Sequence, residues 1–272
     1  MPEIAEVETF KTQLEKILVD KTIEHFNVYH NRAVRRQNIK EFISIVEKTK
    51  IIEIIRYGKY LSFHLDNSKY LNVHLRMSGR FLIFDKTTSI DNLPKHSHVV
   101  ISTDEQLIVY IDPRTFGEFW LTDHLPSQIK NGVDAFLSKS SDLLEALTKM
   151  KNSSRPIKSI LLDQEIIAGI GNIYSDEICS CAGIKPSRQM KKISEDEFNV
   201  LTKCISKVIK QAIKDRGSSL KDESFKDLHG QIGSYQNKHV VHARSNCKRC
   251  GLKVTKIKVS GRSTYFCDNC QN

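Results

Sequence analysis

Four cysteines near the end of the chain are the feature that most restricts how it can fold. Cys247 and Cys250 form one CxxC pair, Cys267 and Cys270 form a second, and sixteen residues separate the two pairs. Four thiolates at this spacing are typical of a tetrahedral structural zinc site on two hairpin tips. Because protein side chains would fill all four coordination positions, we expect one structural Zn²⁺ with no catalytic part.

The remaining three cysteines, Cys179, Cys181 and Cys204, fall in segments with helical patterns, and we predict that they are packed thiols. An odd total of seven cysteines, four of them in CxxC pairs, favours a metal site in a reducing compartment over a disulfide framework.

Length and charge narrow the class of protein. A chain of 272 residues is long enough for more than one core, and its formal charge of +10 with a pI near 9.2 favours a polyanionic partner. No apolar run is long enough to span a membrane, and no signal-like segment precedes the first helical pattern. We therefore expect a cytoplasmic monomer that binds nucleic acid and no membrane, associated with the nucleoid if the source is a bacterium.

Apolar spacing predicts an α+β chain whose two halves differ. Residues 3–20 and 39–47 have helical periodicity, residues 22–28 read as a strand, and a series of short strands with turn residues between them follows from 51 to 121. This pattern indicates an N-terminal antiparallel β-sandwich flanked by helices. Beyond residue 141 the pattern is helical, at 142–150, 155–164, 172–182 and 195–215. Ser194 and Glu197 form a capping box for the last of these helices, and residues 218–238 read as a polar, mobile loop.

The first residues could carry covalent chemistry. A small residue after the initiator favours removal of Met1, which would leave Pro2 with a free secondary amine. An α-amine titrates near ~8, well below the ~10.4 of lysine, so part of it is nucleophilic near neutral pH. Attack on a sugar carbon would give an iminium ion, and the neighbouring Glu3 could move protons. The alternative is that Pro2 is simply a favourable first residue of a helix.

Three further stretches could contact a nucleic acid. The glycine turn 168–172 opens a helix whose free N–H groups can hold a phosphate, and Lys158 could join that site. The alternative is a plain corner between two helices. Because no strand is predicted before the turn, a dinucleotide-binding fold is disfavoured. The turns 74–79 and 112–117 present Met77, Arg114 and Phe116, which could wedge into a base stack or belong to the core.

In combination these motifs resemble one family over nearly the whole chain. The motifs that carry the resemblance are the opening Pro-Glu, the segments 58–61, 74–79, 95–98, 112–117 and 169–174, and the final segment from Gly261-Arg262 to Cys270-Gln271. They occur in this chain in the same order as in the family. The chain resembles the formamidopyrimidine-DNA glycosylases, which have a helix–two-turn–helix fold and a zinc finger. The resemblance implies a β-sandwich catalytic domain at 1–130, a helical DNA-binding domain at 131–228 and a zinc-finger module at 229–272.

The resemblance also implies roles for matching residues. Pro2 would be the Schiff-base nucleophile, Glu3 its acid/base partner, and Lys59 and Arg262 would assist β- and δ-elimination. The void-filling residues would be Met77, Arg114 and Phe116, and DNA backbone contacts would come from His74, His96, Lys158 and Asn172. This sequence departs from the family pattern at Ala5, Thr115 and 152–154, and its 218–238 loop does not match cleanly, so no base-reading residue is assigned.

The activity implied is base excision repair of damaged double-stranded DNA. The enzyme would be a DNA-formamidopyrimidine glycosylase, a hydrolase that releases oxidised purines such as 8-oxoguanine and formamidopyrimidines. It would also be a lyase that nicks the abasic site by β,δ-elimination. Ile4 and the Gly-Arg-x-Thr-x-x-Cys ending favour the purine branch. The alternatives are a pyrimidine-directed glycosylase of the endonuclease VIII type and a non-catalytic, zinc-dependent DNA-binding protein.

Overall fold

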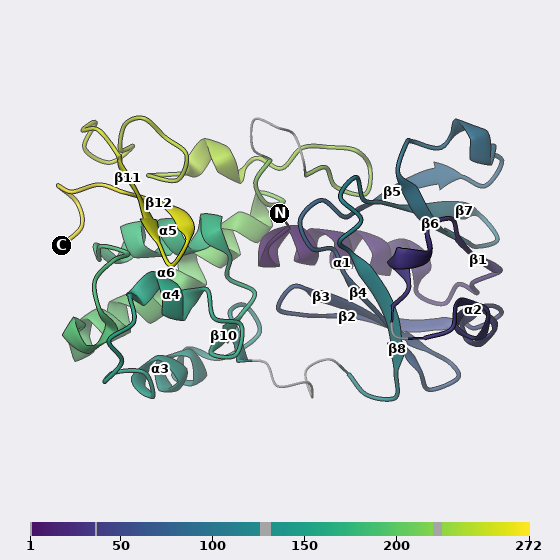
Figure 1. Cartoon of the computed structure of the whole chain (residues 1–272), viewed down its shortest axis with the longest axis horizontal. Coiled ribbons are helices and arrows are strands. Elements are labelled where there is room, and N and C mark those ends of the chain that lie inside the picture. The colour runs from purple at the N-terminus through teal and green to yellow at the C-terminus, as the bar shows by residue number, and fades with distance from the viewer. Residues whose placement is uncertain (1, 36, 126–131, 220–224) are drawn as a thin grey trace. The chain divides into compact units, whose positions relative to one another are not determined.

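The chain forms two compact units, which Figure 1 shows together with the element labels used below. The computed structural model describes residues 2–35, 37–125, 132–219 and 225–272. The first unit combines residues 1–129 with 216–233, and the second combines 130–215 with 234–272. Residues 216–233 thus pack with the start of the chain, far from them in sequence. The linear three-part division suggested by the sequence stays a prediction.

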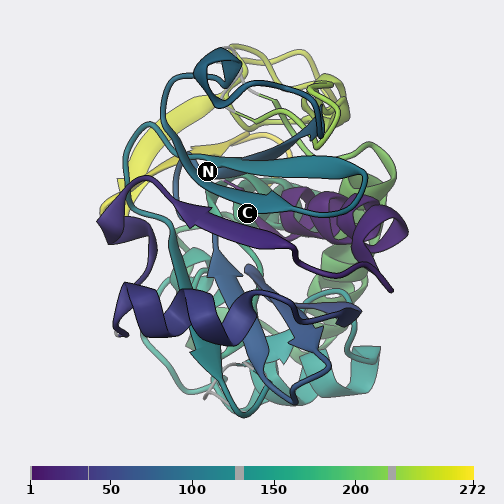
Figure 2. The same cartoon turned by 90° about the vertical axis from the view of Figure 1, so that its right-hand side faces the viewer.

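Two antiparallel four-stranded sheets form the first unit (Figure 2). One sheet has the order β1-β6-β7-β5, with its strands at His25–Val28, Ser97–Ser102, Gln106–Ile111 and Arg80–Asp85. The other has the order β2-β3-β4-β8, with its strands at Ile51–Tyr57, Tyr60–Leu65, Tyr70–His74 and Glu118–Thr122. The series of short strands predicted between residues 51 and 121 is present, and the predicted antiparallel sheets are confirmed.

A large apolar core lies within the first unit, apart from a smaller apolar cluster on β6 and β7. It combines side chains from both sheets with the apolar stripe of α1 (Ile4–Leu18) and with α2 (Ile39–Val46). Phe119 of β8 is fully buried and makes edge-on ring contacts with Phe26, Phe81 and Tyr110, all three on the other sheet. Phe10 of α1 adds a further edge-on contact with Phe81. These aromatic pairs therefore join the helix and the two sheets.

The second unit is mainly helical. Its helices are α3 (Ser140–Thr148), α4 (Ile157–Leu161), α5 (Asn172–Ala182) and α6 (Glu195–Lys214). Short 3₁₀ turns lie at Met190–Lys192 and Tyr235–Lys238 in this unit, and at Asn31–Ala33 and Ile90–Asn92 in the first unit. The predicted capping box of α6 is confirmed: the Ser194 hydroxyl accepts the Glu197 N–H at 3.3 Å, and the Glu197 carboxylate accepts the Ser194 N–H at 2.8 Å. The hairpin β11–β12 (Thr255–Val259 and Arg262–Phe266) completes this unit.

Several local predictions were wrong. The helix predicted at 155–164 is reduced to α4, because Pro156 precedes it and the Asp163 carboxylate accepts the Glu165 N–H at 3.1 Å, a local bond that competes with the helix. A two-residue strand, β10 (Ile167–Ala168), does precede the glycine turn and pairs in parallel with β9 (Val133–Asp134). The helix predicted at 172–182 is present with these bounds, and its N-cap is Gly171.

The predicted polar loop 218–238 also has more structure than its composition indicated. Residues 220–224 lie outside the described part of the chain. After them, Phe225 and Leu228 are buried in the core of the first unit, and the Asp227 carboxylate accepts the N–H groups of His229 and Gln231 at 3.1 and 2.8 Å. Because Phe225 and Leu228 stand among polar residues, the composition of the segment does not reveal that they are buried.

Two of the cysteines predicted to be packed thiols are instead joined. Cys181 of α5 and Cys204 of α6 form a disulfide, which corrects the prediction for this pair, whereas Cys179 is a buried free thiol as predicted. The two helices pack closely enough to bring both side chains together, a contact that spacing in sequence does not reveal. Separately, the helices of the described residues include none with the length and apolar character of a membrane span.

The aromatic core generates a stability prediction. Phe119→Ala should lower the free energy of unfolding of the first unit by about 3–5 kcal/mol, because it leaves a cavity where the two sheets meet. Ile52→Ala, on the exposed side of β2 with 43% of Ile52 accessible, should change it by less than about 0.5 kcal/mol. Equilibrium denaturation measures both, and equal losses in the two variants would contradict this assignment of the core.

Candidate active site and zinc centre

The start of α1 is buried and is bonded to a later segment of the first unit. Pro2 is buried, and Glu3 and Glu6 are each 1% exposed. One oxygen of the Glu6 carboxylate accepts the Glu3 N–H at 2.9 Å, and the other accepts the Ser218 N–H at 2.7 Å. Gly217, with a φ of +76°, lies so close that a Cβ there would be 2.5 Å from the Glu6 carboxylate. Glu6 therefore fixes the helix start against the 216–219 segment.

The turn that carries Lys59 is tied to the same helix. Gly58 and Lys59 form the two-residue turn between β2 and β3, with a φ of +56° at Gly58. Arg56, only 2% exposed, donates to Glu8 of α1 and through Nη1 to the Gly58 carbonyl at 3.0 Å. A partly buried ion pair thus links α1 with the backbone next to Lys59, a residue that is itself 9% exposed.

His74 is held in its neutral form at the end of β4. Burial lowers its pKa to about 3, with further contributions from the positive charges of Arg76 and Lys59. Its Nδ1 accepts the Arg76 N–H at 2.9 Å, so the ring proton lies on Nε2. Nε2–H is a hydrogen-bond donor of the kind that a phosphate oxygen accepts.

The predicted wedge residues lie on two exposed turns of the first unit. Met77 is 39% exposed on the turn after β4, and Phe116 is 46% exposed on the turn before β8. The guanidinium of Arg114 lies 5.0 Å from the centre of the Phe116 ring. Neither Met77 nor Phe116 is part of the core, so the alternative that they are core side chains is wrong. His96 is exposed on a third turn with a φ of +69°.

In the second unit Lys158 and Asn172 converge on the finger hairpin. Lys158 Nζ, fully buried, lies 2.6 Å from the Asp176 carboxylate and donates to the Ser263 carbonyl at 3.2 Å. Asn172 Nδ2 donates to the same carbonyl at 3.0 Å. The second Asp176 oxygen accepts from His242 Nδ1 at 2.7 Å and from the Tyr265 N–H at 3.2 Å. Lys158 is therefore engaged inside the unit.

Arg262 stands next to the tip of that hairpin. Val259 pairs with Arg262, and the turn residues Ser260 and Gly261 both have positive φ angles, +47° and +76°. This is the backbone of a tight two-residue hairpin turn. The Arg262 side chain is exposed, and the bonds to Ser263 and Tyr265 fix the strand from which it projects.

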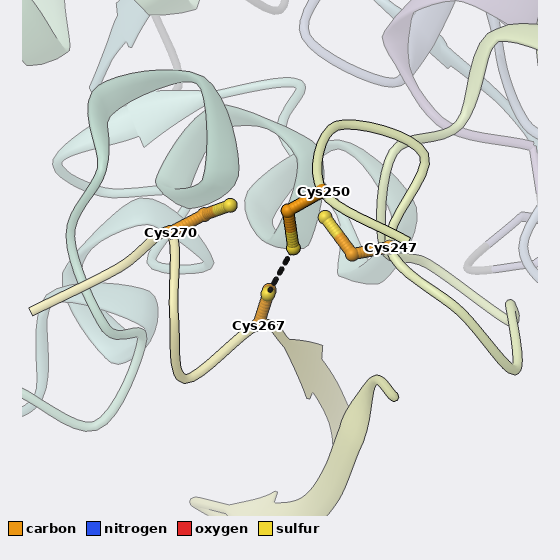
Figure 3. Close-up of side chains that lie close together, drawn as sticks. All are labelled: Cys247, Cys250, Cys267 and Cys270. Carbon is orange, nitrogen blue, oxygen red and sulfur yellow. Dashed lines mark hydrogen bonds between the residues drawn. The ribbon is translucent and has the colours of Figure 1, made fainter. Parts of the chain in front are cut away.

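The four cysteines of the two CxxC pairs meet at one point (Figure 3). Their sulfur atoms all lie within 4.8 Å of one another, and those of Cys250 and Cys267 are 3.5 Å apart. A tetrahedral zinc with Zn–S bonds of about 2.3 Å sets neighbouring sulfurs roughly 3.8 Å apart, so the residues present fit the ion. Cys247 and Cys267 are buried, and the site is one structural zinc centre.

Sequence reasoning missed the residues that hold these positions. Glu6, Asp176 and Glu177 are buried carboxylates that accept backbone N–H groups from segments distant in sequence. Asp112, also buried, accepts the hydroxyl of the distant Ser78 and the N–H of the nearby Gly117. Glu6 and Asp112 lie inside stretches singled out above, but their partners depend on tertiary contacts. An acidic residue amid apolar neighbours was the one available signal.

The zinc assignment predicts metal content. The double change Cys247→Ser/Cys267→Ser should reduce bound zinc from one equivalent per chain to none, because two of four ligands are lost. Cys179→Ala, a change at a buried cysteine outside the cluster, should retain the metal. Elemental analysis measures the zinc, and faster amide exchange in β11–β12 of the double variant should accompany its loss. Zinc retained in the double variant would refute the ligand set.

The lowered pKa of His74 predicts a pH dependence of stability. In the unfolded chain His74 takes up a proton with the ordinary histidine pKa of 6.5. In the folded chain its pKa is about 3, so it stays neutral until the pH is much lower. The stabilisation is therefore complete above pH 6.5 and is lost as pH falls toward 3. Chemical denaturation from about pH 7.5 to 5 should show a steeper decline in the wild type than in His74→Gln. Parallel declines would show that His74 is not the group responsible.

Comparisons with known proteins agree with this architecture. Residues 1–119 match the family model of the formamidopyrimidine-DNA glycosylase N-terminal domain, residues 132–224 match that of its H2TH domain, and residues 245–272 match a zinc finger found in FPG and IleRS. Formamidopyrimidine-DNA glycosylases from Carboxydothermus hydrogenoformans and Listeria monocytogenes are 36% and 32% identical to this chain, with 100% of each chain covered.

Solved structures lead to the same family. A crystal structure of a Lactococcus lactis FPG mutant with a DNA containing Fapy-dG is 32% identical and superposes with a TM-score of 0.90, covering 99% of both chains. The MutM (FPG) protein of Thermus thermophilus is 30% identical with a TM-score of 0.87, covering 99% of this chain and 98% of that one. The chain belongs to the formamidopyrimidine-DNA glycosylase family.

Proposed function

We propose that this protein excises oxidised purines, including 8-oxoguanine and formamidopyrimidines, from duplex DNA and then nicks the abasic site. The observation that carries the proposal is the enclosed start of α1, where Pro2 is followed by the buried Glu3, with Lys59 on a turn tied to the same helix. Relatives of this family have been solved with DNA containing Fapy-dG and with DNA containing an abasic site, which supports both steps.

In the proposed first step the amine of Pro2 attacks C1′ of the damaged nucleoside, and the bond from C1′ to the base breaks. The base leaves with the electron pair of that bond and takes up a proton. The attacking nitrogen loses its proton, the C1′–O4′ bond of the sugar ring opens, and O4′ takes up a proton. The product is an iminium ion at C1′ with a permanent positive charge, which draws electron density from the neighbouring C2′–H bond. Glu3 moves the protons, as an enclosed carboxylate next to the reacting amine can do.

In the second step a proton leaves C2′ and the 3′ phosphate departs, which is β-elimination. Loss of the 5′ phosphate by δ-elimination follows, and hydrolysis then frees Pro2. Lys59 is proposed to assist the first elimination and Arg262 the second, each by stabilising a departing phosphate. His74, His96, Lys158 and Asn172 are proposed to serve the DNA backbone. For Lys158 the support is indirect, because its Nζ is engaged with Asp176 and Ser263.

The wedge residues Met77, Arg114 and Phe116 are proposed to fill the gap left by the extruded nucleotide. Extrusion costs a few kcal/mol of lost stacking and pairing, and apolar and planar side chains inserted into the stack offset part of this cost. The protein is proposed to act as a monomer in the cytoplasm, on the DNA of the nucleoid. A second candidate substrate is an oxidised pyrimidine, because one relative, the Lactococcus lactis Fpg, has been solved with such a DNA.

Borohydride trapping on a duplex with one lesion tests the proposal. The reductant should fix a covalent protein–DNA adduct with the wild type and with Lys59→Ala, because the iminium forms on Pro2. No adduct should form when Pro2 is replaced by Gly with an acetylated terminus. Glu3→Gln should slow base release strongly yet retain part of the nicking of a pre-formed abasic site. Lys11→Ala, an exchange of the same kind as Lys59→Ala on α1, serves as the control.

Peptide mapping then locates the adduct. An adduct on any residue other than Pro2 would overturn the mechanism while leaving the glycosylase activity in place. Tight binding of the lesion duplex with neither base release nor an adduct would favour the non-catalytic DNA-binding alternative. Parallel assays with purine and pyrimidine lesions distinguish the two substrate classes.

A further inference from the structure

Two separate turns of the first unit meet at one buried carboxylate. The turn 75–79 connects β4 with β5 and carries Met77, and the turn 112–117 connects β7 with β8 and carries Arg114 and Phe116. Asp112, the first residue of the second turn, is 1% exposed. Its carboxylate binds the side chain of Ser78 on the first turn and backbone N–H groups of the second turn.

Each oxygen of Asp112 accepts more than one donor. Oδ1 accepts the hydroxyl of Ser78, the residue after Met77, and the N–H of Arg114 at 3.2 Å. Oδ2 accepts the N–H of Gly117, the residue after Phe116, at 2.7 Å. Donors adjacent to or within all three wedge residues therefore converge on one side chain. A third turn joins them, because the Asp112 N–H donates to the His96 carbonyl at 3.1 Å.

The hydroxyl of Tyr110 lies against this carboxylate and packs closely against a glycine of each turn. It donates to Asp112 Oδ2 at 3.4 Å, and burial, followed by the charge of Asp112, raises the pKa of Tyr110, which keeps the hydroxyl protonated. A Cβ at Gly79 would lie 2.4 Å from the Tyr110 oxygen, and one at Gly117 would lie 1.6 Å from it. A glycine from each turn thus encloses the hydroxyl, and neither position leaves room for a side chain.

We propose that Asp112, seated by Tyr110, is the positioning residue that holds Met77, Arg114 and Phe116 in the arrangement needed to enter the base stack. This inference rests on the proposed function, which gives those three side chains their wedge role. A carboxylate shared between the turns makes them one rigid body before DNA arrives, so less conformational freedom is lost when the wedge enters the duplex. Asp112 acts through the turns and does not touch the DNA.

Asp112→Asn tests the proposal with little change in volume. The amide has one acceptor oxygen and an NH₂ group, so one side of the junction would place a donor against the Gly117 N–H or the Arg114 N–H. Single-turnover excision from a lesion duplex should fall roughly ten- to hundredfold. Nicking of a duplex with a pre-formed abasic site, which has no base to extrude, should fall less than about threefold. Asp85→Asn, the same exchange at an exposed carboxylate of β5, should leave both rates unchanged.

A double-mutant cycle separates positioning from general damage to the fold. In a Met77→Ala/Phe116→Ala background, which has lost most of the wedge, Asp112→Asn should reduce excision by less than about twofold further. Fluorescence of a 2-aminopurine next to the lesion, which rises when the stack opens, should respond more slowly in Asp112→Asn than in the wild type. Losses that multiply fully across the two sets of substitutions would overturn the proposal.

Tyr110→Phe keeps the test valid if Asp112→Asn does not fold. It removes one donor to the carboxylate and leaves the ring, and it should show a smaller loss with the same selectivity for the lesion duplex. Wild-type excision in both Asp112→Asn and Tyr110→Phe, with Met77→Ala/Phe116→Ala impaired, would refute this inference and leave the proposed function standing. Absence of excision and trapping in the wild type would instead refute the proposed function.

Discussion

The loops that carry candidate site residues depend on buried carboxylates that accept backbone N–H groups. Glu6 joins the start of α1 to the 216–219 segment, Asp112 joins two turns of the sandwich, and Glu177 of α5 accepts the N–H groups of Val240, Val241 and His242 at 2.8 to 3.0 Å. A carboxylate in a low-dielectric interior is costly unless several donors surround it. Where the donors come from loops, the same bonds that offset this cost also fix loop conformation, so each loop is rigid without a long regular element of its own.

The zinc finger is likewise attached to its unit by buried side chains that bind backbone groups. Zinc orders the two CxxC knuckles, but the position of β12 depends on Lys158, Asn172 and Asp176, which bind the Ser263 carbonyl and the Tyr265 N–H. The buried Lys158–Asp176 pair is compensated on both sides, since each partner makes a further hydrogen bond. Arg262 begins this strand. Its position within the unit therefore depends on helix residues about ninety positions earlier in the chain.

The chemistry and the recognition of DNA have different structural requirements in this family. The proposed covalent attack needs a nucleophile, a proton carrier and a phosphate partner in fixed positions, and the Glu8–Arg56 pair joins α1 to the strand that leads into the turn of Lys59. Opening a duplex needs exposed apolar and planar side chains. On flexible loops these side chains would lose much conformational freedom when they enter the DNA, which would weaken binding. The sandwich core joins α1 to both sheets, and the turns that carry Lys59, Met77 and Phe116 extend from those sheets.

The sequence by itself determined the strands of the two antiparallel sheets, the main helices of the second unit, the zinc ligands and the family. Strand alternation, the capping box and each CxxC pair are local patterns, and the family follows from the order of short motifs along the chain. Only the tertiary structure decided which partners meet. Residues 216–233 pack with the start of the chain, Cys181 meets Cys204, Lys158 faces Asp176 instead of solvent, and Asp112 collects donors from two turns. Such pairings cross the core, where burial and geometry select the partner, and no spacing along the chain encodes them.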